Sequence, residues 1–295
     1  MSAIHQATFA HAYQRYMGAL SAELPATLGM NSSTHVAQVC LDPDKPDTAE
    51  RAVVKYFRYS DKGWANEYIA WSLAQELGVI TAPRAALLIG QPSEVSAEHG
   101  PELNRAIRLS AEPMVLWCTS AVDPTRPLQQ VLGHAWEQAA LRVDAGKLMG
   151  ALDGWTANCD RIANNALYWV TKGSLVAIDH EKMAFNQDWS NQKVSHEDEV
   201  VGPDGKPLLP TRLIDVLMKA KKSKDKALKK SAAKAADFMY EHSKSKHPPT
   251  LAKCKASIAA MIDSNFSQQA TQNLLSFLDY RVTEDCLKRR YAILI

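Results

Sequence analysis

No stretch of this 295-residue chain approaches the ~20 consecutive apolar residues that a helix needs to cross a bilayer. The N-terminal residues, MSAIHQATFAHAYQRYMGAL, mix polar side chains and histidine throughout and lack the unbroken apolar core of a leader peptide. Net charge is nearly lacking too, because 34 Lys and Arg residues offset 32 Asp and Glu residues and leave a formal charge of +2. The sequence therefore predicts a cytoplasmic protein without a transmembrane segment, and its overall charge gives no argument for binding nucleic acid.

A cysteine pattern typical of disulfides or zinc sites is lacking as well. The five cysteines form an odd set without a C-x-x-C pair, so neither a disulfide framework nor a zinc site is expected. The chain does have hydrophobic residues at 46% of its positions. Over this length they suffice to bury a large core, in one two-lobed domain or in two small ones.

Strand patterns dominate the first part of the chain. Two short β-branched runs, HVAQVCL and RAVVKYF, flank the turn-rich DPDKPD and predict an antiparallel hairpin. A helix is expected over residues 64–78, ending at Gly78, and further strands are expected over residues 79–90 and 113–119. From residue 128 on, the pattern is mostly helical. The predicted fold class is α+β, with a small β-rich lobe over residues 1–119 and a larger, mostly helical lobe over residues 120–295.

Acidic and amide side chains gather in the segment LDGWTANCDRIANNALYWVTKGSLVAIDHEKMAF, residues 152–185. Its two short apolar strands, ALYWV and SLVAID, are separated by the turn-forming TKGS, so the predicted hairpin brings Asp160, Asn165 and Asp179 to one end. Carboxylate and amide oxygens are the ligands that Mg²⁺ prefers. Each of these residues taken alone is also an ordinary turn residue, and their combination favours a metal site.

A family resemblance rests on the same segment. The run N-x-D-R-x-x-x-N is made of Asn158, Asp160, Arg161 and Asn165. Together with the following apolar strand and AIDHE, this run resembles the catalytic and metal-binding loops of HipA-like kinases and, more distantly, of phosphoinositide kinases. The resemblance implies a two-lobed protein-kinase-like fold that uses ATP and Mg²⁺. It makes Asp160 the catalytic base and Asn165 and Asp179 the metal ligands, while Glu181 fits either a further ligand or a surface charge.

The resemblance also requires a lysine on a strand of the first lobe and a glutamate on the helix that follows. Lys55 lies in RAVVKYF, and Glu67 lies near the start of the helix over residues 64–78. In this fold such a lysine binds the α- and β-phosphates and the glutamate pairs with it. A solvent-facing strand lysine and an acidic residue of a first helical turn are the alternatives.

The remaining nucleotide contacts are less distinctive in the sequence. The phosphate-covering loop is expected over residues 29–36, where Ser32 and Ser33 offer hydroxyls, although a polar linker has the same composition. Adenine is expected beside the strand that leads into the lobe connector, at Trp117 and Cys118. Packing in the strand core accounts for these two side chains equally well.

Lysines cluster at residues 219–230, opposite an apolar helical stripe that runs from residue 213 to residue 238. This cluster is either a solvated helix face or a docking site for an acidic partner. The resemblance as a whole, which covers residues 36–185, implies an ATP-dependent kinase that acts on a hydroxyl, with protein Ser or Thr favoured and a protein substrate as partner. A lipid or small-molecule acceptor, and a nucleotide-binding pseudokinase or interaction protein, stay open.

Overall fold

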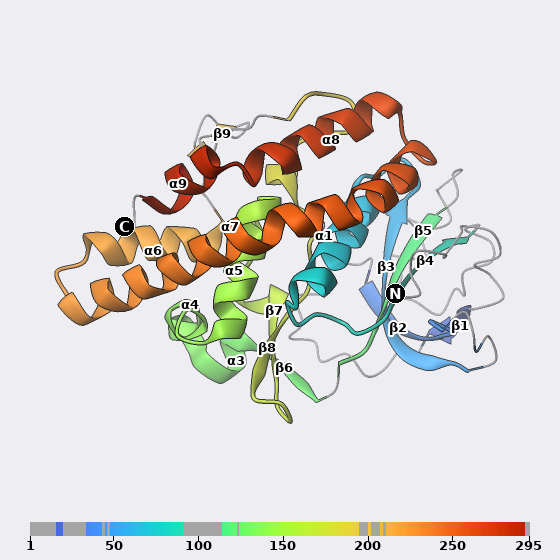
Figure 1. The fold of residues 1–295 in the computed structure, drawn as a ribbon. Helices are drawn as coiled ribbons and strands as arrows, with labels where there is room; N and C mark the ends of the chain where they lie inside the picture. Colours follow the sequence, from blue (N-terminus) through green and yellow to red (C-terminus); the bar gives the residue numbers. More distant parts are fainter. Residues whose placement is uncertain are drawn as a thin grey trace. The chain divides into compact units, whose positions relative to one another are not determined.

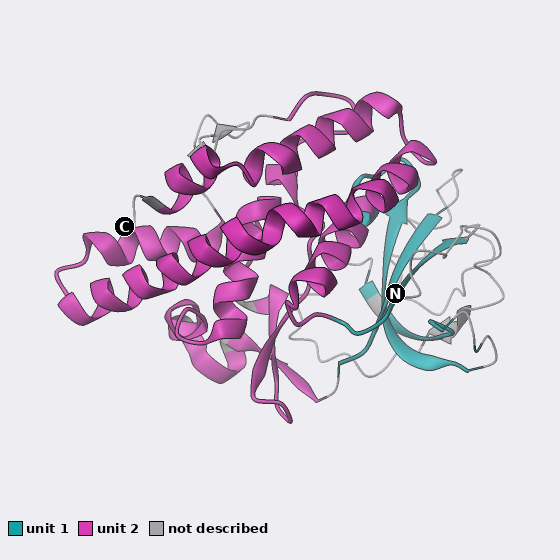
Figure 2. Ribbon diagram, in the orientation of Figure 1, with its two compact units in different colours: residues 1–64, 82–123 teal, residues 65–81, 124–295 magenta. Residues whose placement is uncertain are grey.

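The computed structural model describes residues 16–19, 34–42, 45, 48–90, 114–122, 124–194, 200–201, 207–208 and 211–292. The chain forms two compact units (Figure 2). The first consists of residues 1–64 and 82–123, and the second consists of residues 65–81 and 124–295. Most of the helix that lies between two strands of the first unit in the sequence is therefore grouped with the second unit.

A five-stranded antiparallel sheet forms the first unit, with the strand order β1-β2-β3-β5-β4 (Figure 1). Its strands are β1 (Tyr16–Ala19), β2 (Thr34–Val39), β3 (Glu50–Arg58), β4 (Ala85–Gly90) and β5 (Met114–Ser120). The hairpin predicted from the sequence is confirmed as β2–β3, in which Thr34 pairs with Lys55 and Val39 with Glu50. β1 has no counterpart among the predicted strands.

Side chains alternate between the two faces of this sheet, as the two-residue period of a strand requires. On β3, Val54 and Tyr56 join the buried apolar cluster, which also contains Cys118 of β5. Lys55 lies on the opposite face and is half-buried. Its register partner on β5 is Trp117, so the lysine and the tryptophan share a face of the sheet.

Helix α1 (Gly63–Leu77) follows β3 and ends as the sequence predicts. Gly78 has a φ of +71°, the left-handed conformation that favours glycine just after a helix. The strand expected over residues 79–90 is too long, because β4 begins only at Ala85. The carbonyl of Ile80 accepts the N–H of Ala177 within the second unit, and this preceding stretch therefore does not pair into the sheet of the first unit.

A second antiparallel sheet, with the order β6-β7-β8, lies in the second unit. Its strands are β6 (Thr125–Pro127), β7 (Ala166–Trp169) and β8 (Ser174–Ala177). The β7–β8 hairpin confirms the prediction from ALYWV and SLVAID, and Gly173 in its turn has a φ of +59°. A separate two-stranded pair is made of β9 (Val200–Val201) and β10 (Pro207–Leu208).

Helices make up most of the second unit. They are α3 (Leu128–Leu132), η3 (Gly133–Ala135), α4 (Trp136–Ala140), α5 (Asp144–Thr156), η4 (Ala163–Asn165), η5 (Ala184–Asn186), α6 (Arg212–Lys222), α7 (Lys226–Asp263), α8 (Gln268–Arg281) and α9 (Glu284–Ala292). The long helix α7 packs against α5, α6, α8 and α9, and so forms the centre of the helical packing (Figure 1). Buried residues recur along it every three or four positions, among them Leu251, Cys254 and Ile258.

Two helices, α6 and α7, carry the apolar stripe expected over residues 213–238. Asp225 begins α7, because its carboxylate accepts the N–H groups of Ala227 at 2.8 Å and Leu228 at 3.2 Å. No helix in the described part of the chain has both the length and the apolar character needed to span a membrane. The small antiparallel sheet and the larger helical part confirm the predicted α+β class.

Candidate active site

The candidate site begins where α5 ends. Ala157 has a left-handed φ of 51°, which turns the chain out of the helix into the loop that contains Asp160. The loop closes with η4, whose last residue is Asn165, directly before β7. Asp160 and Asn165 therefore lie between α5 and β7, just before a strand, as the sequence predicts.

Arg161 organises this loop from the protein interior. Its guanidinium forms a two-point ion pair with Asp153 of α5, with Nη2–Oδ1 at 2.8 Å and Nε–Oδ2 at 2.9 Å, and neither side chain has exposed surface. Its Nη1 donates to the backbone oxygens of Asn165 and Ile178. Burial lowers the pKa of the Arg161 guanidinium, but the charge and hydrogen bonds of Asp153 raise it overall. One buried cation thus holds α5, the Asp160 loop and the end of β8 together.

Asn158 joins the same segments by its side-chain amide. Its Oδ1 accepts the N–H of Asp160 at 3.2 Å, and its Nδ2 donates to the carbonyl of Asp179 at 3.3 Å. The side chain is fully buried. The amide therefore ties the loop of Asp160 to the loop of Asp179, which are 19 residues apart in the sequence.

Asp160 is fixed by its backbone and by one carboxylate oxygen. Its carbonyl accepts Nδ2 of Asn165 at 2.7 Å, and its Oδ2 accepts Nζ of Lys182 at 2.9 Å. The amide nitrogen of Asn165 is thereby used, and its Oδ1 is the atom that can ligate a cation. The Asp160 side chain is partly exposed, and within the described residues no donor contacts its Oδ1.

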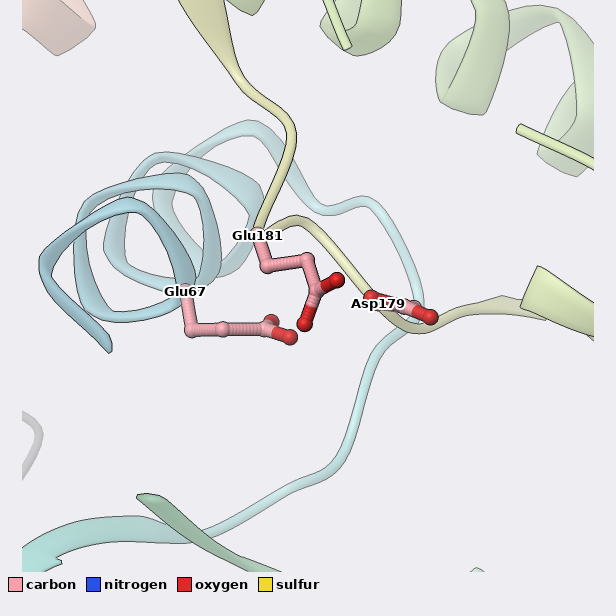
Figure 3. A group of neighbouring side chains, drawn as sticks. All are labelled: Glu67, Asp179 and Glu181. Atoms are coloured by element: carbon pink, nitrogen blue, oxygen red, sulfur yellow. The ribbon is translucent and has the colours of Figure 1, made fainter. Parts of the chain in front are cut away.

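Three carboxylates from two segments converge beside this loop. Glu67 of α1 and Asp179 and Glu181 of the loop after β8 each offer an oxygen, and these oxygens lie within 4.8 Å of one another (Figure 3). Glu67 is 2% exposed, and its Oε2 accepts the N–H of His180 at 3.0 Å. Asp179 has a φ of +61°, a conformation that costs a residue other than glycine about 1–3 kcal/mol and that clusters at functional sites.

His180 faces inward between these acids. Its Nδ1 lies 3.2 Å from Nη2 of Arg161, which can only donate, so Nδ1 accepts and the ring proton is on Nε2. The side chain is 2% exposed. The His180 side chain thus contacts Arg161, while its backbone N–H is bound by Glu67.

The donor set of this cluster fits a hard divalent cation. Mg²⁺ prefers carboxylate and amide oxygens, and three carboxylates so close together repel one another unless a cation or protons offset their charge. Among the described residues no other group of three or more His, Cys, Asp or Glu side chains meets in this way. Asp179, a ligand predicted from the sequence, belongs to the cluster, and Asn165 is tied to the same loop because its carbonyl accepts the N–H of Ile178 at 3.4 Å.

The other predicted nucleotide residues lie in the first unit or outside the described residues. Lys55 is on β3, and its expected pairing with Glu67 of the second unit stays a prediction. Trp117 and Cys118 are buried in the middle of β5, which pairs with β3 on one side and β4 on the other. Burial raises the pKa of the Cys118 thiol, as expected for a packing residue. Ser32, Ser33 and most of the loop expected over residues 29–36 fall outside the described part of the chain.

The lysine cluster lies at the end of α6 and the start of α7. Its seven lysines, Lys219, Lys221, Lys222, Lys224, Lys226, Lys229 and Lys230, are all exposed. Only Lys219 has an acidic partner among the described residues, Asp215 at 2.5 Å. Docking of an acidic partner at residues 219–230 stays a prediction.

Two contributors to the site were not assigned by sequence reasoning. Asp153 lies in the acidic segment over residues 152–185, but its pairing with Arg161 depends on how α5 ends. Lys182 was not singled out, although it stands three residues after Asp179. The only hint in the sequence was its place beside a cluster of acidic residues, which is too common to identify one lysine.

No protein-family model matches the sequence, and no curated protein matches it. Among solved structures, the crystal structure of a Helicobacter pylori proinflammatory kinase, CtkA, is similar to this chain. The match covers 91% of this chain and 95% of that one, with 13% sequence identity and a TM-score of 0.49. A likeness of this degree shows neither a shared substrate nor a shared mechanism.

Proposed function

We propose that this protein is an ATP- and Mg²⁺-dependent kinase that transfers the γ-phosphoryl group to a hydroxyl. The observation that carries the proposal is the convergence of the Asp160 loop and the Asp179 loop on the buried Arg161–Asp153 pair. Phosphoryl transfer asks little covalent chemistry of a protein, but it needs fixed oxygen ligands and a positioned carboxylate. This pair of loops offers both within one compact unit.

Asp160 is the proposed catalytic base. Its carboxylate accepts the hydrogen bond of the acceptor hydroxyl and takes the proton as the hydroxyl oxygen attacks the γ-phosphorus. The bond from the γ-phosphorus to the bridging oxygen breaks at the same time, and ADP leaves with that electron pair. The half-exposed Asp160 side chain suits this role, because an acceptor has to reach it.

Asn165 and Asp179 are the proposed ligands of Mg²⁺, and Glu181 and Glu67 provide further oxygens near Asp179. When bound, the ion neutralises charge on the phosphates of the nucleotide. Asn165 presents its Oδ1 because its Nδ2 donates to the carbonyl of Asp160. Asp179 has a left-handed conformation, and its carbonyl accepts Nδ2 of Asn158.

The nucleotide contacts of the first unit are part of the same proposal. Lys55 would bind the α- and β-phosphates, with Glu67 as its acidic partner, and Ser32 and Ser33 would contribute hydroxyls. Adenine would lie near Trp117 and Cys118. Because β5 is paired on both sides, the backbone of these two residues is engaged in the sheet.

Protein Ser or Thr is the acceptor that the resemblance to HipA-like kinases favours, and a cytoplasmic location goes with it. A lipid or small-molecule kinase has the same metal and base requirements. A pseudokinase would bind MgATP without transfer and would have no need of a base such as Asp160.

Incubation with γ-labelled ATP separates these functions. The purified protein is incubated alone and with cell lysate, and the labelled molecules are identified after separation of protein, lipid and small-molecule fractions. Label on a protein hydroxyl is the expected result, and label confined to lipid or to a small molecule would change the acceptor class. A thermal shift with MgATP but no label in any fraction would favour the pseudokinase.

A further inference from the structure

Lys182 contacts the Asp160 loop through both its backbone carbonyl and its side chain. Its carbonyl accepts the N–H of Cys159 at 3.4 Å and the thiol of Cys159 at 3.6 Å. Its side chain then reaches Asp160, where Nζ donates to Oδ2 at 2.9 Å. The backbone contact fixes the origin of the lysine side chain next to the carboxylate, so less freedom is lost in forming the ion pair than between two independent surface residues.

The contact with Lys182 leaves Asp160 with one defined acceptor atom. The N–H of Asp160 is bound by Asn158, its carbonyl by Asn165 and its Oδ2 by Lys182. In the described part of the chain no donor is within hydrogen-bond reach of Oδ1. The hydrogen bond at Oδ2 restricts rotation of the Asp160 carboxylate, so the orientation of Oδ1 is restricted as well.

Charge gives the contact a second effect. Asp160 is 19 residues from Asp179 in the sequence but shares its network, in which Glu67 and Glu181 add two further carboxylates. Lys182 supplies a positive charge on the Asp160 side. A lysine ammonium is charged at neutral pH.

We propose that Lys182 is a positioning residue for phosphoryl transfer, which holds Oδ2 of Asp160 so that Oδ1 faces the acceptor hydroxyl. This inference rests on the proposed kinase function and deepens it. Lys182 acts through Asp160, and its loss therefore lowers the rate of transfer without lowering the affinity for MgATP. In this proposal the hydrogen bond between Lys182 and Asp160 stays in place during phosphoryl transfer and does not have to break first.

Three variants test this role: Lys182→Met removes the charge at similar length, Lys182→Arg keeps a cation, and Lys193→Met is the control. Lys193 is an exposed lysine of the same unit. Transfer from γ-labelled MgATP to lysate protein and to water is measured as kcat, and MgATP affinity is measured by calorimetry. We expect kcat of Lys182→Met to fall ~10- to 100-fold, the size of effect that misplacing a reacting group has. Lys182→Arg should stay within a few-fold of wild type, and Lys193→Met should equal wild type.

A double variant distinguishes positioning from a general structural role. When Asp160→Asn has already removed the charged base, Lys182→Met should lower kcat by less than about threefold, because residues that act as one unit are not additive. A full multiplicative loss on top of Asp160→Asn would overturn the inference. So would a Lys182→Met variant with wild-type kcat, with raised kcat, or with weakened MgATP binding alone.

Failure of the kinase proposal gives a different pattern. If Asp160→Asn transfers label as fast as wild type, or if wild type transfers none, the proposed function fails and the role of Lys182 fails with it. If Asp160→Asn is impaired while Lys182→Met is not, only the role of Lys182 is refuted. Circular dichroism of each variant checks the fold, and Lys182→Gln replaces Lys182→Met if that variant does not fold.

Discussion

Removing the guanidinium of Arg161 should destabilise the second unit strongly, because it leaves a buried charge without its partner. Arg161 and Asp153 form a 2.8 Å ion pair in which neither side chain has exposed surface. In Arg161→Met the new side chain fills similar space but carries no N–H group. The Asp153 carboxylate then loses both of its guanidinium bonds, and the carbonyl oxygens of Asn165 and Ile178 lose theirs.

The expected loss follows from the burial of the pair. Removing one partner of a buried ion pair costs about 3–5 kcal/mol in the free energy of unfolding. Lys255 and Asp279 provide a matched control in the same unit, since they form an ion pair at 2.7 Å with side chains 47% and 48% exposed. Breaking such an exposed pair costs about 0.2–1 kcal/mol, so Lys255→Met should be nearly neutral.

Urea unfolding followed by far-ultraviolet circular dichroism measures both variants, and the helices of the second unit supply most of the signal. The midpoint of Arg161→Met should fall at an unchanged slope m. Adding Asp153→Leu should restore part of the loss, because it removes the unpaired charge while the two carbonyl oxygens stay unsatisfied. A stabilising role of the buried pair is refuted if Arg161→Met is no less stable than Lys255→Met, or if Asp153→Leu lowers the stability of Arg161→Met further.

Three further predictions concern protons, nucleotide and metal. Burial holds the pKa of His247 well below its ordinary value. Below about pH 6.5 the imidazole therefore takes up a proton in the unfolded chain but not in the folded one. The free energy of unfolding then falls by up to ~1.4 kcal/mol for each pH unit of acidification. Urea midpoints between about pH 7.5 and pH 5 should show this slope, and His247→Leu should flatten it. MgATP should raise the thermal midpoint of wild type, and scanning fluorimetry should find a smaller shift in Lys55→Ala; equal shifts would contradict its role. Glu181→Gln should raise the Mg²⁺ concentration that gives half-maximal ATP turnover, and an unchanged Mg²⁺ titration would exclude Glu181 as a ligand.

Local patterns predicted the elements that surround the site. The β2–β3 and β7–β8 hairpins follow from short apolar runs separated by turn residues, and the end of α1 follows from Gly78. In each case neighbouring residues decide the structure. The overlong strand over residues 79–90 shows the limit, because Ile80 finds its partner in Ala177, almost a hundred residues further along the chain.

The contacts that fix the site join residues from different segments of the chain, and local sequence patterns do not predict them. Asp153 reaches Arg161 because Ala157 takes a left-handed conformation after α5, although alanine gives no indication of this in the sequence. Lys182 reaches Asp160 because two loops 22 residues apart are joined by backbone hydrogen bonds. Helix α7 likewise continues through Pro248 and Pro249, which local rules treat as helix breakers, with buried residues on both sides of them.

We propose that Asp160 acts on the acceptor, whereas Asp179 acts on the nucleotide-bound metal. Asp160→Asn and Asp179→Asn test it most directly when MgATP affinity and transfer of labelled phosphate are measured on the same preparations. Asp160→Asn should bind MgATP as wild type does and should transfer phosphate ~10²-fold more slowly or worse, as expected for the loss of a positioned base. Asp179→Asn should lose both affinity and transfer. Transfer by Asp160→Asn within a few-fold of wild type, or undiminished MgATP affinity in Asp179→Asn, would contradict this division of roles.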